Sequence, residues 1–224
     1  MEIVIAQDPR EIIKSHISFS ARSKLSNLVI DAYKWSELLI NNTAAFKTLR
    51  GQKRLLPEIK NVAVEFFIIQ AVKNKELPFL CRSAYNSNRS HTYLELYNED
   101  TLIHFNQVSS KNKCGRKAVC RDRVTKPLES YIDYSDNINP TISVDSKNYF
   151  QVNHGYQTST PSFITLGIPN GEGILNGSIP LLQEFVVVEG FYPKSKIQTV
   201  DEISFEDFQR YAEGDGLEDV EKQV

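Results

Sequence analysis

The sequence is short of the residues that mark several common classes of protein. Its 224 residues include three cysteines, Cys81, Cys114 and Cys120, with one methionine and one tryptophan. An odd, small number of cysteines in a chain of this length argues against a disulfide framework and favours reduced thiols. No apolar run is long enough to cross a bilayer, and the amino terminus, MEIVIAQDP, lacks the pattern of a secretory signal. We therefore expect a cytoplasmic protein that makes no membrane contact.

The chain also lacks the signatures of common cofactor and metal sites. Its glycine-rich sequence IPNGEGILNG has neither dinucleotide-binding spacing nor the Lys-Ser/Thr pair of a phosphate-binding loop, which predicts an ordinary turn. Cys114 and Cys120 are spaced more widely than paired zinc ligands, and His104 adds only one further ligand upstream. We expect no cofactor and no metal, with His91, Glu95 and His104 as the alternative ligands of a divalent ion if their strands converge.

What the chain does contain is an uneven distribution of charge. The formal net charge is −2, but residues 111–126 hold seven basic side chains and one acidic side chain, which give +6. Several Lys and Arg side chains along one stretch bind phosphates and gain affinity by counterion release. The basic segment therefore predicts contact with nucleic acid, although a basic loop can also be a solvated surface. Its candidate phosphate ligands are Lys111, Lys113, Arg116, Lys117, Arg121, Arg123 and Lys126.

The acidic counterpart lies at the end of the sequence. Residues 201–224 contain nine acidic side chains against Arg210 and Lys222, which give −7. Runs of like charge are typical of solvated tails and of interaction segments. Two interpretations stay open: the tail is solvated or contacts a protein partner, or it folds over residues 111–126 and competes with an anionic ligand.

The first third of the sequence is expected to be helical. Asp8 is a suitable N-cap and Pro9 a suitable first residue for a short helix. Apolar residues recur at near-helical spacing over residues 23–39, which predicts an amphipathic helix, and another is expected after residue 42 or 43. Residues 57–72 are apolar on nearly every side, so this helix is predicted to be the central buried one.

After Pro78 the apolar period changes from helical to alternating, which is typical of strands and hairpins. To place the apolar residues of the second and third strands on one face, Leu96 must lie opposite Ile103, and Leu94 opposite Phe105. On the other face this register pairs Glu95 with His104, Tyr93 with Asn106, and Tyr97 with Leu102. The strands are expected at residues 79–85, 91–97, 101–108, 149–153, 163–168 and 184–189.

The order of these elements predicts an α+β fold in which an amino-terminal helical layer packs on a mostly antiparallel sheet, followed by the acidic tail. We expect a single domain over residues 1–224. The alternative division has a helical appendage at 1–52, an α+β core at 53–200 and the tail at 201–224. Residues 127–148 are polar and are expected to form a long surface excursion.

The polar face of the predicted hairpin is the candidate catalytic site. A carboxylate beside an imidazole can divide base and acid roles in metal-independent RNA cleavage, with Glu95 as base and His104 as acid. Arg116 and Arg121 are the candidate stabilisers of charge on the phosphate. Tyr93 is the candidate platform for a stacked base. The same Glu–His pair is also a favourable cross-strand contact that needs no catalytic role.

These patterns together predict a nucleic-acid-directed protein of bacterial or phage type. Single-stranded RNA is the expected partner, and a metal-independent ribonuclease of toxin or defence type is the expected activity. The alternative is a non-enzymatic module that binds a protein partner and carries a basic surface loop. The sequence contains no indication of oligomeric state.

Overall fold

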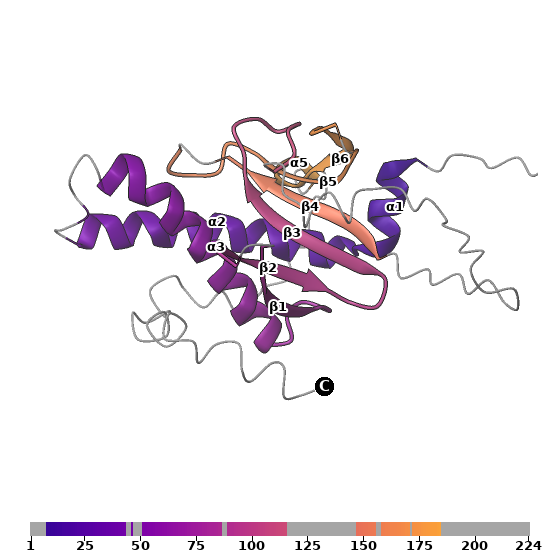
Figure 1. Ribbon diagram of the computed structural model, residues 1–224, viewed down its shortest axis with the longest axis horizontal. Coiled ribbons are helices and arrows are strands. Elements are labelled where there is room, and N and C mark those ends of the chain that lie inside the picture. The colour runs from indigo at the N-terminus through magenta and orange to yellow at the C-terminus, as the bar shows by residue number, and fades with distance from the viewer. Residues whose placement is uncertain are drawn as a thin grey trace, which may run out of the picture.

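The computed structural model describes residues 8–43, 46, 51–86, 89–115, 147–155, 158–170 and 172–184. Within these residues, the amino-terminal helices pack on one sheet of six strands in the order β1-β2-β3-β4-β5-β6, as Figure 1 shows. The α+β prediction is therefore confirmed. None of the helices in the described ranges is both long enough and apolar enough to span a membrane.

Helix α1 begins where its capping residues predict, and α2 begins four residues before the predicted start at residue 23. Helix α1 (Pro9–His16) has Asp8 as its N-cap, whose carboxylate accepts a hydrogen bond from the Arg10 amide at 2.9 Å. Helix α2 (Phe19–Asn42) is capped by Ser18, and a short π-helical segment, η2 (Gly51–Leu55), precedes α3 (Leu56–Lys73). These confirm three predicted helices. The one expected after residue 42 or 43 lies largely outside the described residues.

Five of the predicted strands are confirmed. The six observed strands are β1 (Leu80–Tyr85), β2 (Thr92–Tyr97), β3 (Thr101–Gln107), β4 (Asn148–His154), β5 (Ile164–Pro169) and β6 (Leu175–Pro180). All neighbouring pairs are antiparallel except β3 and β4, which are parallel.

The glycine-rich sequence was predicted as an ordinary turn, but its first residues end β5 and its last residues begin β6. Gly177 has a positive φ of 60°, and a Cβ there would lie 2.2 Å from the Pro9 Cβ, so its glycine serves close packing of α1 on β6. The strand expected at residues 184–189 does not include Glu184, which instead ends the short helix α5 (Leu181–Glu184). Residues 185–189 lie outside the described residues.

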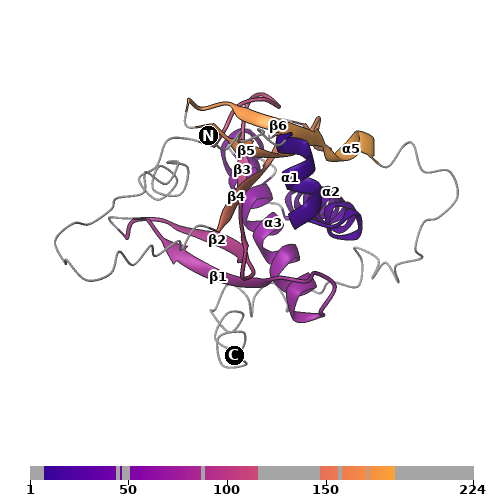
Figure 2. The same ribbon diagram turned by 90° about the vertical axis from the view of Figure 1, so that its right-hand side faces the viewer.

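The predicted hairpin register is confirmed where β2 and β3 pair. The ladder contains Leu96 opposite Ile103, together with Glu95–His104 and Tyr97–Leu102. It ends at Glu95–His104, so the expected pairs Leu94–Phe105 and Tyr93–Asn106 lie beyond it. Figure 2 shows the reason, because β1 and β2 turn away from β3 and β4 as the sheet twists.

The hydrophobic core lies between the sheet and helices α2 and α3 (Figure 2). Alternation along the strands sends one set of side chains, which includes Leu96, Ile103, Phe150, Val152 and Leu166, to the helical face, where each is fully buried. Burying one such side chain contributes roughly 1.5–3 kcal/mol. The opposite face of the sheet is left to polar residues.

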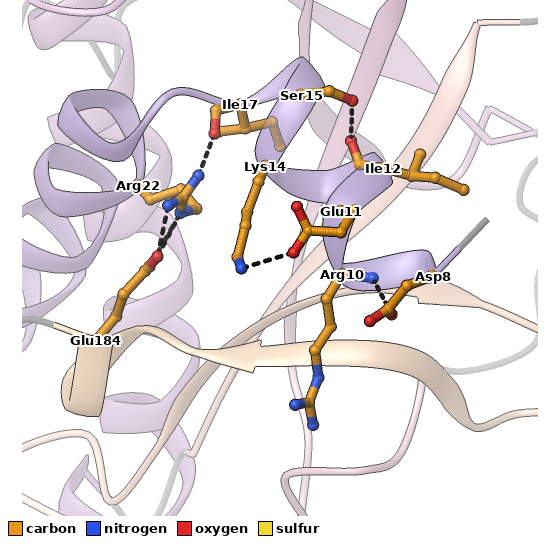
Figure 3. A network of polar contacts seen from close by, with 9 residues as sticks. All are labelled: Asp8, Arg10, Glu11, Ile12, Lys14, Ser15, Ile17, Arg22 and Glu184. Carbon is orange, nitrogen blue, oxygen red and sulfur yellow. Dashed lines mark hydrogen bonds and ion pairs between the residues drawn. The ribbon is translucent and has the colours of Figure 1, made fainter.

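One ion pair joins the two ends of the described chain, as Figure 3 shows. Arg22 is only 5% exposed, and its Nε lies 2.9 Å from both carboxylate oxygens of Glu184. Another of its guanidinium nitrogens donates to the Ile17 carbonyl between α1 and α2. Because a guanidinium fork matches a carboxylate, this contact fixes α5 against the amino-terminal helices.

Candidate functional site

The sheet face opposite the helices carries a row of polar side chains that are buried. The strand register places Arg82, Glu95, His104 and Gln151 side by side on β1, β2, β3 and β4. Glu95 is 6% exposed, His104 2% and Gln151 1%. Buried polar groups in proteins are nearly always hydrogen-bonded, so the partners of these side chains determine what the face can do.

The row forms one chain of contacts across the sheet. Arg82 Nε donates to Glu95 Oε2 at 2.7 Å, and Glu95 Oε1 lies 3.3 Å from His104 Nε2. On its other side, His104 Nδ1 lies 2.9 Å from the Tyr149 hydroxyl. Gln151 Nε2 donates to that hydroxyl at 3.0 Å. The structure therefore brings the predicted base and acid together and joins them to Arg82.

The contacts assign the roles of the two imidazole nitrogens. Because the Gln151 amide donates to the Tyr149 oxygen, the Tyr149 proton is available to His104 Nδ1, which places the proton of a neutral His104 on Nε2, facing Glu95. Burial by itself raises the pKa of Glu95, but the hydrogen bonds from His104 and Arg82, with the charge of Arg82, outweigh it and hold the pKa below its ordinary value. Glu95 is thus an ionised carboxylate at neutral pH.

Arg82 is the functional residue that the sequence reasoning missed. Its side chain is 53% exposed although its Nε binds a carboxylate that is 8% exposed. The sequence did contain a signal for Arg82. Residues 79–85 alternate like a strand, and pairing this strand with the next one places Arg82 on the same face as Glu95. At the end of that face, the guanidinium carbon of Arg82 lies 5.1 Å and Lys147 Nζ 4.8 Å from the centre of the Tyr97 ring.

The first residues of the basic segment cross this face, and we call residues 111–115 the strap. The Lys111 carbonyl accepts from the Thr165 hydroxyl at 3.1 Å, and the Lys113 carbonyl accepts from the Asn153 side-chain amide at 2.8 Å. The Gly115 amide donates to Gln151 Oε1 at 3.1 Å. The side chains of Lys111 and Lys113 are exposed, so the strap's main chain faces the sheet while its cations face solvent.

Gly115 is required by the closeness of this contact. A Cβ at Gly115 would lie 2.4 Å from Asn106 Oδ1, a distance that real side chains do not occupy. On its far side the strap is held by the turn before β6, where Lys113 pairs with Ile174 and the Cys114 amide donates to the Gly173 carbonyl at 2.9 Å.

Several predicted site residues cannot be placed on this face. Arg116, Lys117, Arg121, Arg123 and Lys126 lie outside the described residues, as does the acidic tail. Tyr93, the candidate stacking platform, is half-buried, with its ring centre 5.1 Å from that of His104. It lies on the same face as Glu95 and His104, beside the imidazole, and its role as a stacking platform stays a prediction.

A second set of buried polar groups lies on the helical side of the sheet. The Tyr33 hydroxyl of α2 lies 2.8 Å from Nδ1 of His154, which is fully buried at the end of β4. Burial lowers the pKa of His154 to about 4. Lys60 of α3 donates to Glu37 at 2.9 Å and to the Thr158 carbonyl at 2.7 Å. These contacts connect the helices to the sheet.

In the described part of the chain, no group of three His, Cys, Asp or Glu side chains is arranged to hold a metal ion.

Comparison with protein-family models, curated proteins and solved structures finds no match to this chain.

Proposed function

We propose that the protein binds single-stranded RNA at the polar face of its sheet. The observation that supports this most is the direct attachment of the strap to that face, where the Gly115 amide binds the Gln151 side chain. The predicted cationic segment and the predicted Glu95–His104 pair thereby share one hydrogen-bond network, which runs through Gln151 and Tyr149.

The phosphate ligands of the described residues are Lys111, Lys113 and Arg82. Both lysines are exposed on the strap, and Arg82 is 53% exposed at the other end of the network. Cations placed along one face follow a nucleic-acid backbone and give an affinity that falls steeply with salt. The amide side chains beside them carry the donors and acceptors that recognise unpaired bases.

Binding of a labelled single-stranded RNA oligonucleotide, measured at several salt concentrations, tests this proposal. We expect the double variant K111Q/K113Q to bind at least about tenfold more weakly and to reduce the slope of log K against log salt by about 1.4, since each phosphate contact to a single strand contributes about 0.7. The matched control is K14Q/K34Q, which removes the same charge from lysines that are 48% and 54% exposed on α1 and α2. Equal slopes for the two variants, or salt-insensitive binding to a protein partner instead, would contradict the proposal.

A second candidate, metal-independent cleavage of the bound RNA, is favoured by the 3.3 Å contact of Glu95 with His104 and by the Arg82 guanidinium beside them. In this reaction Glu95 takes the proton of the attacking 2′-hydroxyl, the imidazolium form of His104 protonates the leaving oxygen and becomes neutral, and Arg82 stabilises the charge on the phosphate.

The cleavage test uses purified protein in the presence of a chelator. E95Q and H104Q are expected to reduce the cleavage rate by 100-fold or more, because each removes a group that transfers a proton, which is typically worth 10²–10⁴-fold. The K14Q/K34Q variant should keep the wild-type rate. Unchanged cleavage by H104Q would remove the catalytic candidate and leave the binding proposal standing.

A further inference from the structure

The polar face carries more hydrogen-bonding capacity than the strap satisfies. Asn106 and Asn153, which are paired across β3 and β4, lie beneath the strap and are 5% and 0% exposed. Asn106 Nδ2 donates to Asn153 Oδ1 at 3.2 Å, but the buried Oδ1 of Asn106 has no hydrogen-bond partner among the described residues. This unpaired acceptor lies directly under Gly115.

The strap itself contributes little apolar burial. Residues 111–113 are exposed and residues 114–115 are half-buried, so none of the five is part of the hydrophobic core. Its attachment consists of hydrogen bonds to the side chains of Gln151, Asn153 and Thr165, and of backbone bonds to the turn before β6. Segments held by few apolar contacts open at a lower free energy than the core around them.

We propose that the strap is a displaceable cover that occupies the position of the RNA. The inference rests on the proposed RNA binding. The side-chain amides that now bind peptide C=O and N–H groups present the donors and acceptors that base edges require. When the strap lifts, Lys111 and Lys113 move with it and contact the phosphates of a strand whose bases take over the contacts with Asn106, Gln151 and Asn153.

Such a cover gives the protein selectivity for unpaired bases. The face is filled by the strap until a ligand offers replacement hydrogen bonds, since leaving buried amides without partners is unfavourable. A polyanion without bases attracts the exposed lysines but cannot replace the strap on the sheet. The expected ligand is therefore unpaired RNA, and polyphosphate of the same charge should bind weakly.

A reversible cross-link tests the displacement directly. Lys113 and Ile174 are directly opposite in an antiparallel bridge that lies between two backbone hydrogen bonds, a pair geometry with Cα atoms about 4.5 Å apart, which suits a disulfide. Both side chains are exposed, Ile174 by 50%, so K113C/I174C should not disturb the fold. Cys114 and Cys120 are replaced by serine to prevent other pairings.

The reduced and oxidised forms of this variant have the same charge and differ only in whether the strap can leave. We expect the oxidised form to bind a single-stranded RNA oligonucleotide at least tenfold more weakly than the reduced form, with affinity restored by a reductant. Equal affinity of the two forms would overturn the cover. If the parent that carries only the serine replacements at Cys114 and Cys120, with Lys113 and Ile174 in place, does not bind RNA at all, the proposed function fails instead, so the two failures are distinguishable.

Hydrogen exchange without RNA provides a second measurement. The amides at positions 114 and 115 are expected to exchange at least tenfold faster than the amides of β4 and to become protected in the oxidised cross-linked form, in which serine occupies position 114. Exchange of all these amides at one rate would show that the strap opens only with the whole sheet and would overturn the inference.

Discussion

The two faces of the sheet are both buried, but they are buried by different means. On the helical face, apolar side chains such as Phe150 and Val152 pack against α2 and α3. On the polar face, side chains such as Glu95 and Gln151 are satisfied by hydrogen bonds to neighbouring strands and to the strap. Apolar packing therefore holds the fold together on the helical face, whereas hydrogen bonds hold the side chains of the polar face in place.

Titratable groups also differ between the faces. On the polar face, the partners of Glu95 favour its charged form and hold its pKa low. On the helical face, burial favours the neutral form: it lowers the pKa of His154 to about 4 and raises that of Glu65 on α3 to about 7. The polar face thus keeps Glu95 charged, whereas burial on the helical side favours the neutral forms of His154 and Glu65.

The largest effect is expected from breaking the helical face. Phe150 is fully buried in the core, with 0% solvent exposure. Phe150→Ala should therefore lower the free energy of unfolding by about 3–5 kcal/mol. Urea denaturation measures this change. Leu38→Ala, at a position that is 45% exposed, is the control and should cost less than about 1 kcal/mol. Similar losses for both variants would mean that the helical face does not hold the fold.

A smaller effect concerns His154. Its pKa of about 4 lies below the ordinary value of 6.5, so the unfolded chain binds more protons between these values, and its contribution to stability falls as pH drops from 6.5 to 4. Since one pKa unit corresponds to about 1.4 kcal/mol, the full contribution is on the order of 3 kcal/mol. Unfolding free energies of the wild type and of His154→Gln across this range should differ in slope; parallel curves would contradict the buried neutral imidazole.

The smallest effect is that of Glu65, and it has the opposite sign. Its pKa of about 7 lies above the ordinary 4.5, so the folded state binds more protons and stability falls as pH rises from 4.5 to 7. Glu65→Gln should therefore stabilise the protein by about 1–3 kcal/mol at pH 8 and by little at pH 4.

The two titrations offset each other in the wild type between about pH 4.5 and 6.5, so the slope attributed to His154 should be steeper in the Glu65→Gln background. Denaturation of the single variant at the two pH values, beside the wild type, provides the measurement. A constant difference at both pH values would show that the Glu65 carboxyl is charged in the fold.

The periodicity of the sequence was sufficient to predict the register of β2 and β3. Alternation predicted the Glu95–His104 pair, since a one-residue slip would send Leu96 and Ile103 to opposite faces. The same reasoning applied to β1 would have found Arg82. It could not find Tyr149 and Gln151 as partners, because the parallel pairing of β3 with β4 joins segments whose side chains carry no local signal of one another.

The burial of the polar face was beyond sequence reasoning for a related reason. An alternating strand with Glu95 and His104 on one side resembles a half-exposed strand, and nothing within it indicates that residues 111–115 cross above its neighbours. The sequence of β6 was misleading in a different way, because Gly177 is typical of turns but here allows close contact with Pro9.

The parallel ladder of β3 and β4 has a consequence for how the site is assembled. Seven residue pairs join Thr101–Gln107 to Asn148–His154, and Arg22 with Glu184 joins the same two parts of the chain again. Arg82, Glu95 and His104 belong to the part before residue 116, while Tyr149 and Gln151 belong to the part after residue 146. A polypeptide cut between them would behave as a split protein, in which two fragments must reassociate before the polar face is complete.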